Sequence, residues 1–162
     1  MCDREEAYMP RPCAGVFFDP IKLPRRFGKY QFLMPYTVQT TKHGPYRKFS
    51  GHVTMDELLT SLSEVQTAPG FDSFKFTISD FLDVKSYEFT EFDLLKYRAQ
   101  VRGGEYLNSG LISGLVVTDP EIIELLKTRY EAFSNYTVEY FSTLDTCVSW
   151  IENTTGKTVL LD

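Results

Sequence analysis

The chain has 162 residues, of which 43% are hydrophobic and 24% are charged, and its formal net charge is −5. This length suits one domain, with or without a tail. The acidic balance argues against general nucleic-acid binding, which draws its affinity from Lys and Arg on phosphates. No apolar run approaches the roughly 20 residues that span a bilayer. We therefore expect a cytoplasmic globular protein with no membrane span and no nucleic-acid partner.

Residues that could bind metals or form disulfides are few. The odd number of cysteines (Cys2, Cys13 and Cys147) and the absence of a CxxC pair indicate no disulfide framework. Only His43 and His52 could supply imidazole ligands, so a zinc cluster is not expected. No glycine-rich turn has the strand and helix context of a phosphate or dinucleotide site. The sequence predicts neither a metal nor a cofactor.

Residues 1–33 differ in composition from the rest of the chain. They hold four of the eight prolines and carry six basic against four acidic residues. Proline fixes φ and removes a hydrogen-bond donor, which argues against a long helix or a central strand. We expect an extended, weakly ordered leader, followed by a folded domain at 34–153 and a tail at 154–162. Two alternatives are that Met34 is the true start of the chain and that the leader is a basic arm docking on a partner.

Five segments have the composition of β-strands. Alternating or continuous runs of β-branched and aromatic residues predict strands at 36–41, 46–51, 74–79, 111–117 and 137–141. The turn chemistry of residues 42–45 joins the first two strands into a hairpin. Residues 80–88 are predicted to form a loop. Residues 158–161 are expected to form either an edge strand or a trailing end.

Four helices are predicted, and each begins behind a side chain that can accept hydrogen bonds from free backbone N–H groups. These caps are Thr54 with Glu57, Thr90 with Asp93, Asp119 before Pro120, and Ser142 or Thr143. The second helix is predicted to bury Phe92, Leu95 and Ala99 and to end near Gly103-Gly104. The third continues its apolar spacing to Tyr130 and Phe133. Cys147 lies on the inward stripe of the last helix, where a free cysteine behaves as a small hydrophobe.

The order of these elements predicts the fold class. Strands that are linked through helices must be parallel, and such crossovers are right-handed. The alternating patterns at 74–79 and 137–141 indicate that helices cover one face of the sheet more fully than the other. The sequence therefore predicts an α/β fold with a mixed, mostly parallel sheet of about five strands. It begins with a β-hairpin and is singly wound as a βα superhelix.

Several stretches of the sequence resemble a known family. They are Met34–Val38, Tyr46–Thr54, Ser79–Val84, Val116–Pro120 and Val148–Ile151. These stretches are similar to uncharacterised bacterial STAS-like proteins, related to the anti-sigma factor antagonists, over about residues 34–153. The resemblance implies the βα superhelical architecture, which CRAL-TRIO lipid-binding domains share. It implies a protein partner if the chain acts as STAS domains do, and a lipid or other apolar ligand if it acts as CRAL-TRIO domains do.

The resemblance also draws attention to Thr90. Regulatory antagonists carry Asp-Ser-Ser-Gly at the start of the helix after the third strand, and one serine is phosphorylated. In the corresponding stretch here, residues 88–91, only Thr90 could replace that serine. A phosphate at a helix N-terminus is favoured by the dipole, but Glu88, Glu91 and Asp93 would repel it. Thr90 is therefore predicted to be an N-cap, with phosphorylation as the alternative.

The candidate binding site lies at the carboxyl ends of the parallel strands, where ligands of open α/β sheets gather. Asp80 and Asp83 follow a predicted strand and have no cap to make, and apolar residues are interleaved with them. We predict that residues 80–84 and 87–89 form the main recognition surface, with apolar anchors rimmed by carboxylates. The candidate binding residues are Asp80, Phe81, Asp83, Tyr87 and Thr90.

Three functions are compatible with this pattern. The first is a non-enzymatic protein-interaction module, with a protein partner of unknown identity or a second copy of the chain. The second is an apolar small-molecule or lipid binder with a cavity between the helices and the sheet. The third is an enzyme that uses Asp80 and Asp83 for acid–base work or to hold a hard cation. No catalytic residue is assigned, because the other candidates have simpler structural roles.

Overall fold

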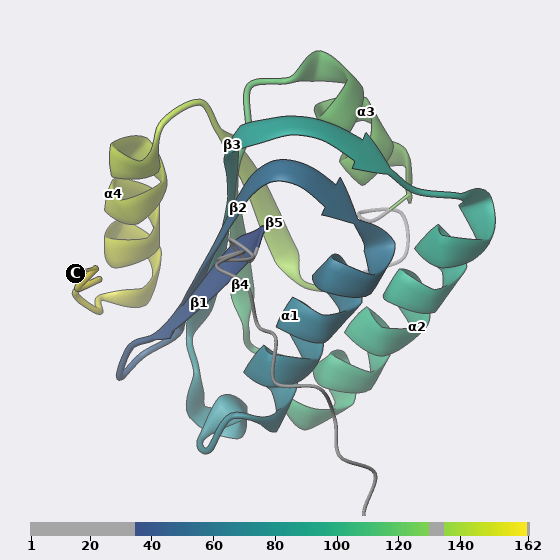
Figure 1. The fold of residues 1–162 in the computed structure, drawn as a ribbon. Helices are drawn as coiled ribbons and strands as arrows, with labels where there is room; N and C mark the ends of the chain where they lie inside the picture. Colours follow the sequence, from purple (N-terminus) through teal and green to yellow (C-terminus); the bar gives the residue numbers. More distant parts are fainter. Residues whose placement is uncertain (1–34, 130–134, 162) are drawn as a thin grey trace, which may run out of the picture. The chain divides into compact units, whose positions relative to one another are not determined.

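The computed structural model describes residues 35–129 and 135–161, and these form a five-stranded sheet with helices on both faces (Figure 1). The strands are β1 (Tyr36–Thr40), β2 (Pro45–Thr54), β3 (Phe76–Glu88), β4 (Ile112–Val116) and β5 (Thr137–Phe141). The helices are α1 (Met55–Thr67), a short 3-10 helix η1 (Phe71–Ser73), α2 (Glu91–Leu107), α3 (Pro120–Arg129) and α4 (Leu144–Thr155).

The strands lie in the sheet in the order β1-β2-β3-β4-β5, which is also their order in the chain. β1 and β2 pair antiparallel as a hairpin, and β2 through β5 pair parallel. The helices α1, α2 and α3 connect successive parallel strands. Because these connections have the same handedness and the sheet grows in one direction, the three helices lie on one face of the sheet (Figure 1). α4 follows the last strand and packs on the other face. The predicted fold class, a mostly parallel and singly wound sheet, is confirmed.

The predicted helix caps are confirmed. In the capping box of α1, the Thr54 hydroxyl accepts a hydrogen bond from the Glu57 N–H (3.4 Å) and the Thr54 N–H donates to the Glu57 carboxylate (2.7 Å). Thr90 and Asp93 repeat this arrangement in α2. The Asp119 carboxylate accepts hydrogen bonds from two backbone N–H groups in the first turn of α3. Thr143, rather than its neighbour Ser142, caps α4.

The core has two sides, one on each face of the sheet. On the face covered by α4, Phe76, Ile78, Cys147 and Ile151 form a buried cluster. A methyl group on Gly114 would overlap the Cys147 sulfur, so the missing side chain lets α4 approach β4 closely. On the opposite face, the largest cluster packs β1 and β2 against α1. The central strands β3 and β4, which carry consecutive buried residues, are therefore covered on both faces.

The prediction of a loop at residues 80–88 is wrong. β3 continues to Glu88 and pairs with β2 along its length, from Tyr46 opposite Ile78 to Thr54 opposite Glu88. At the C-terminal end, residues 158–161 form no strand, and Val159 is buried against the α4 cluster.

The buried face predicted for α2 is also wrong. Phe92 is 66% exposed, Leu95 is 55% exposed and Ala99 is exposed, whereas Val101 is buried together with partly buried Tyr97. The helix also runs through the two glycines to Leu107 instead of ending there. α2 therefore turns one apolar stripe inward and leaves a second one on the surface.

Some predictions lie outside the described residues. These are the extended leader at 1–33, the alternative start at Met34, and the continuation of α3 to Tyr130 and Phe133. Cys2 and Cys13 also belong to the leader, and Cys147 is a free, buried cysteine.

Candidate functional site

β3 is longer than β4, and its second half forms an arch with β2 alone. β3 pairs with β4 only from Phe76 to Asp80, but with β2 as far as Glu88. Figure 1 shows the ends of β2 and β3 bending together over the side of the sheet that carries α1, α2 and α3. We call residues 50–54 and 81–88 the arch.

Two register shifts decide where the side chains of the arch point. Between Lys48 and Ser50, and again between Gly51 and His52, β3 uses one more residue than β2. At each extra residue, the side chains of β3 that would point to one face of the sheet point to the other face instead. As a result Phe81, Val84 and Tyr87, which are three residues apart, line the same pocket.

Asp80, a candidate binding residue, is engaged inside the protein. Its side chain is 3% exposed. One carboxylate oxygen accepts a hydrogen bond from the Tyr46 hydroxyl (2.7 Å), and the other accepts one from the Leu82 N–H (2.9 Å). Burial and the Asp80 carboxylate raise the pKa of Tyr46. These contacts assign Asp80 a structural role at the start of the arch.

Asp83 lies on the surface, on the same side as Asp80. Its carboxylate forms an ion pair with the Lys48 ammonium at 2.8 Å, and this hydrogen bond lowers the pKa of Asp83. Phe81 lies on the opposite side, where its ring stacks on Phe49 with 4.9 Å between centroids. The structure therefore does not bring the two aspartates and the aromatic residues together on one surface.

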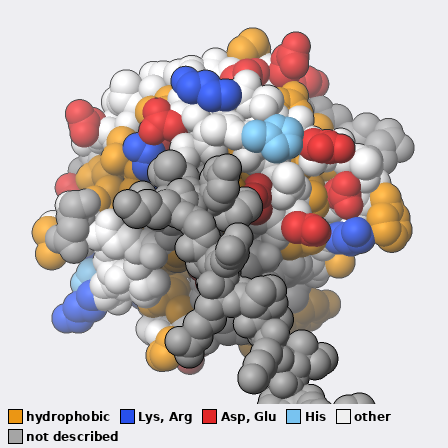
Figure 2. Space-filling model, in the orientation of Figure 1, with side chains coloured by type: hydrophobic (Ala, Val, Ile, Leu, Met, Phe, Trp, Pro, Cys, Tyr) orange, Lys and Arg blue, Asp and Glu red, His pale blue; other side chains and the backbone are white. Residues whose placement is uncertain are grey.

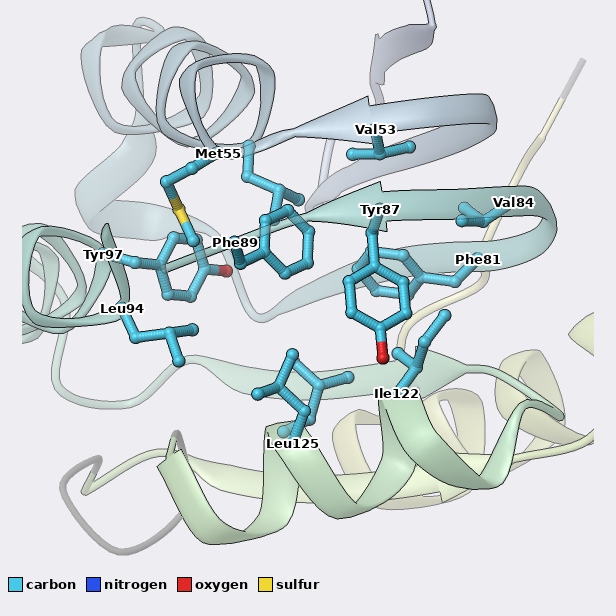
Figure 3. A pocket seen from close by; sticks show the side chains of 12 residues that line it. Val53, Met55, Phe81, Val84, Tyr87, Phe89, Leu94, Tyr97, Ile122 and Leu125 are labelled. Carbon is cyan, nitrogen blue, oxygen red and sulfur yellow. The ribbon is translucent and has the colours of Figure 1, made fainter. Parts of the chain in front are cut away.

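The aromatic residues of the arch instead close an apolar pocket against α1, α2 and α3 (Figure 3). Its walls include Phe81, Tyr87, Phe89, Tyr97, Ile122 and Leu125. The cavity measures about 30 Å³, which is room for about one or two water molecules. In this conformation the side chains fill most of the space between the arch and the helices.

Tyr87 lies where this pocket meets the first turn of α3. Its ring stacks on Phe89 with 5.1 Å between centroids, and in Figure 3 its hydroxyl points towards α3. Burial raises the pKa of Tyr87, and the nearby carboxylates of Glu121 and Asp119 raise it further. The Tyr87 hydroxyl is therefore a polar group at the edge of the apolar pocket, and it stays protonated at neutral pH.

The hydroxyl of Thr90 both donates and accepts a hydrogen bond within the helix cap. It accepts a hydrogen bond from the Asp93 N–H at 3.2 Å and donates one to the Asp93 carboxylate at 2.6 Å. Together with the Thr90 N–H, it lowers the pKa of Asp93. The carboxylate beside the hydroxyl would repel a phosphate at this position.

The exposed stripe of α2 is a surface that sequence reasoning missed. Phe92, Leu95 and Ala99 follow each other at helical spacing, and basic residues flank them. The Lys96 ammonium lies 4.8 Å from the centre of the Phe92 ring. Arg98 and Arg102, with Leu95 and Ala99, line a shallow hollow of about 300 Å³. In Figure 2, a hydrophobic side chain projects beside a basic one at the right-hand edge, over the start of α2.

We call Phe92, Leu95, Ala99 and the flanking Lys96, Arg98 and Arg102 the α2 face. The signal for it was present in the sequence, because α2 carries two apolar stripes and only one of them can turn inward. Beyond the α2 face, Tyr106 and Leu107 at the end of the helix are also exposed.

Two classes of site are absent from residues 35–129 and 135–161. No group of three or more His, Cys, Asp or Glu side chains is arranged to hold a metal ion. Within the same ranges, no helix has the length and apolar character that crossing a membrane requires.

Comparisons with known proteins establish the fold. No protein-family model matches the sequence, and no curated protein matches it. Among solved structures, the anti-sigma factor antagonist SpoIIAA in its unphosphorylated form superposes with a TM-score of 0.50 at 9% identity, covering 72% of this chain and 97% of that chain. The phosphorylated form of SpoIIAA, a Bacillus cell fate determinant, gives a TM-score of 0.50 at 10% identity, with 72% and 98% covered.

A third similar structure is an uncharacterised protein of the DUF3478 family with a SpoIIAA-like fold, from Shewanella loihica PV-4. It has a TM-score of 0.48 at 13% identity and covers 72% of this chain and 91% of that chain. At these identities the similarity concerns the fold. The chain has the SpoIIAA-like, or STAS-like, fold that the sequence resemblance implied.

Proposed function

We propose that the chain is a non-enzymatic protein-interaction module of the STAS type and that its α2 face binds the partner. The observation that carries this proposal is the exposure of Phe92 and Leu95 side by side on one helix. Burying such side chains against a partner is favourable in proportion to the apolar area removed from water. SpoIIAA, which shares the fold, is described as an antagonist of an anti-sigma factor, and that activity requires contact with other proteins.

The charges of the α2 face indicate the chemistry of the partner. Lys96, Arg98 and Arg102 border the apolar stripe, although the chain as a whole carries a net charge of −5. Lys96 pairs with Asp93 at 3.2 Å and Arg102 with Glu105 at 2.9 Å, so a partner's carboxylates would share these cations with groups of the chain. A complementary surface would present apolar side chains bordered by carboxylates. We therefore propose a partner protein with an acidic rim around an apolar centre, rather than a second copy of this chain.

The binding surface can be tested by site-specific photo-cross-linking in the native cells. A photoreactive phenylalanine analogue replaces Leu95 in one version of the full chain and Leu160 in the control version. Leu160 is 71% exposed and follows α4, which packs on the opposite face of the sheet. The proposal expects a cross-linked protein that appears with the probe at 95 and not with the probe at 160.

Binding of the cross-linked protein, once purified, is then measured by calorimetry. The double substitution Phe92→Ser and Leu95→Ser is expected to weaken binding at least tenfold, since apolar anchors at the centre of an interface often contribute 1–2 kcal/mol or more. Leu160→Ser should leave the affinity unchanged. Equal affinities for the two variants, or cross-links only to a second copy of the chain, would contradict the proposal.

A second candidate function, binding of an apolar small molecule, is favoured by the pocket beneath the arch. Its lining is aromatic and aliphatic, with the Tyr87 hydroxyl at one edge. The present cavity of about 30 Å³ is too small for a lipid, so binding would require α3 to move away from the arch. Native mass spectrometry of the chain from its own cells tests this function. A bound mass that is lost in Leu125→Trp would support it, and a bare chain in all charge states would exclude it.

A further inference from the structure

Arg47 is a buried cation without an anionic partner in the described part of the chain. It lies on β2, is 4% exposed, and faces α1. Its Nη2 donates a hydrogen bond to the Ser79 hydroxyl (2.6 Å) and its Nη1 donates one to the Ser61 hydroxyl (3.4 Å). The Nε–H has no hydrogen-bond partner, and none of the ion pairs among the described residues includes Arg47.

A small cavity adjoins this guanidinium. Arg47 and Thr77 line it together with the polar or phenolic side chains of Gln66, Tyr97 and Tyr136. The rest of its wall is apolar and consists of Leu62, Val65, Phe71, Val101 and Leu111. The Thr77 hydroxyl is buried and, like the Nε–H of Arg47, has no hydrogen-bond partner among residues 35–129 and 135–161. The cavity measures about 20 Å³, which is enough for one occupant of about the size of a water molecule.

Elementary electrostatics favours a negative occupant for this cavity. Arg47 carries the positive charge of a guanidinium. A buried charge is costly unless an opposite charge or several hydrogen bonds compensate it. The two neutral serine hydroxyls and the Phe49 ring, whose centroid lies 5.8 Å from the guanidinium carbon, compensate it only in part. Arg47 and Thr77 both line the cavity, and their unused groups, the Nε–H and the hydroxyl, can each donate a hydrogen bond to an acceptor.

We propose that this cavity is a binding site for one small inorganic anion, chloride or an ion of its size, held by Arg47 and Thr77. The volume of about 20 Å³ and the largely apolar walls favour a monatomic ion over a phosphate or a carboxylate, which would need more room. The bound anion neutralises the guanidinium between α1 and the sheet and thereby stabilises the fold. This site is separate from the α2 face and does not depend on the function proposed for that face.

Thermal unfolding of the full chain at constant ionic strength tests the site, with sodium gluconate replacing sodium chloride. Gluconate is too large for the cavity, so the melting temperature should rise as chloride is added. An ion that binds only the folded state should raise it by roughly 3–6 °C for each tenfold increase above the dissociation constant. A crystal soaked in bromide should show one anomalous peak between Arg47 and Thr77.

Three variants separate this site from a general salt effect. Thr77→Val keeps the shape and removes one donor, so it should need more chloride for the same rise in melting temperature. Arg47→Met should abolish the dependence on chloride, whereas Lys157→Met, at an exposed lysine, should retain it. Should Arg47→Met fail to fold, the Thr77→Val titration and the bromide peak decide. Equal melting temperatures in chloride and gluconate, or a water molecule with no bromide peak in the cavity, would overturn the proposal.

Discussion

The Tyr46 hydroxyl donates a hydrogen bond to the Asp80 carboxylate, 2.7 Å away, between the neighbouring strands β2 and β3. The second carboxylate oxygen of Asp80 accepts a hydrogen bond from the Leu82 N–H, where β3 leaves β4 and enters the arch. This one buried side chain therefore fixes both a neighbouring strand and the first turn of backbone in the arch.

We expect Asp80→Ala to lower the free energy of unfolding by about 1–3 kcal/mol, because it leaves the buried Tyr46 hydroxyl and the Leu82 N–H without their acceptor. Urea unfolding measures the change. The matched control is Asp83→Ala, which removes an exposed ion pair with Lys48 and should leave stability nearly unchanged. Equal losses for the two variants would contradict the structural role assigned to Asp80.

The two capping boxes give a second prediction. Thr54→Ala and Thr90→Ala should each destabilise the protein by about 0.5–2 kcal/mol, since each leaves a free N–H of the first helical turn without its acceptor. Thr60→Ala in the exposed middle of α1 is the control and should be neutral or slightly stabilising, because alanine has the higher helix propensity. Chemical denaturation distinguishes these outcomes, and an unchanged midpoint for Thr90→Ala would refute its role as a cap.

The contact between β4 and α4 gives a third prediction. Gly114→Ala introduces a methyl group where the Cys147 sulfur lies, and we expect a loss of about 1–3 kcal/mol from overpacking. In a Cys147→Ala background the same substitution should cost less, because the obstructing sulfur is gone. A double-mutant cycle measures this coupling. Additive effects would show that the helix does not pack as closely as the structure has it.

Alkaline pH should destabilise the fold. Burial raises the pKa of Cys147 from its ordinary 9.0 to about 12. Above pH 9 the unfolded thiol loses its proton while the folded thiol keeps it, so the unfolded state binds fewer protons and stability falls as pH rises. The stabilisation is complete below pH 9 and declines by up to about 1.4 kcal/mol per pH unit for this group until about pH 12.

Buried tyrosines contribute to the same decline, beginning near pH 10, since burial raises the pKa of Tyr36 to about 12. Urea unfolding between pH 7 and 11, under reducing conditions, measures the total effect. In the Cys147→Ala variant, the free energy of unfolding should change little between pH 9 and 10. A wild-type stability that is constant up to pH 10 would contradict the burial of the thiol.

The central fold could be predicted from the sequence because local signals agreed with the final packing. The capping box of Thr54 and Glu57 depends on two residues that are three apart, so its signal can be read from a short stretch of sequence. The hairpin turn and the parallel order of the later strands likewise follow from short stretches and from the helices between them.

The arch could not be predicted in this way. Its polar residues and its broken alternation are typical of a loop, and only the pairing with β2 makes it a strand. The two register shifts that bring Phe81, Val84 and Tyr87 to one side depend on that distant partner. In α2, two apolar stripes were present, and the sequence did not say which one the sheet and α1 would cover. The burial of Arg47 was harder still to predict. Its only sign in the sequence is that Arg47 lies two residues before the buried Phe49 and so points to the same face of β2.

The order of the strands has a consequence for how the chain folds. Neighbours in the sheet are also neighbours along the chain, joined by one turn or by one segment that contains a helix. The loops that must close are therefore short, and each costs little entropy. During synthesis every new strand emerges beside an edge that its predecessor has already formed, and no strand has to be inserted between two others. The sheet can thus grow in one direction, at the pace of translation, from the hairpin to β5.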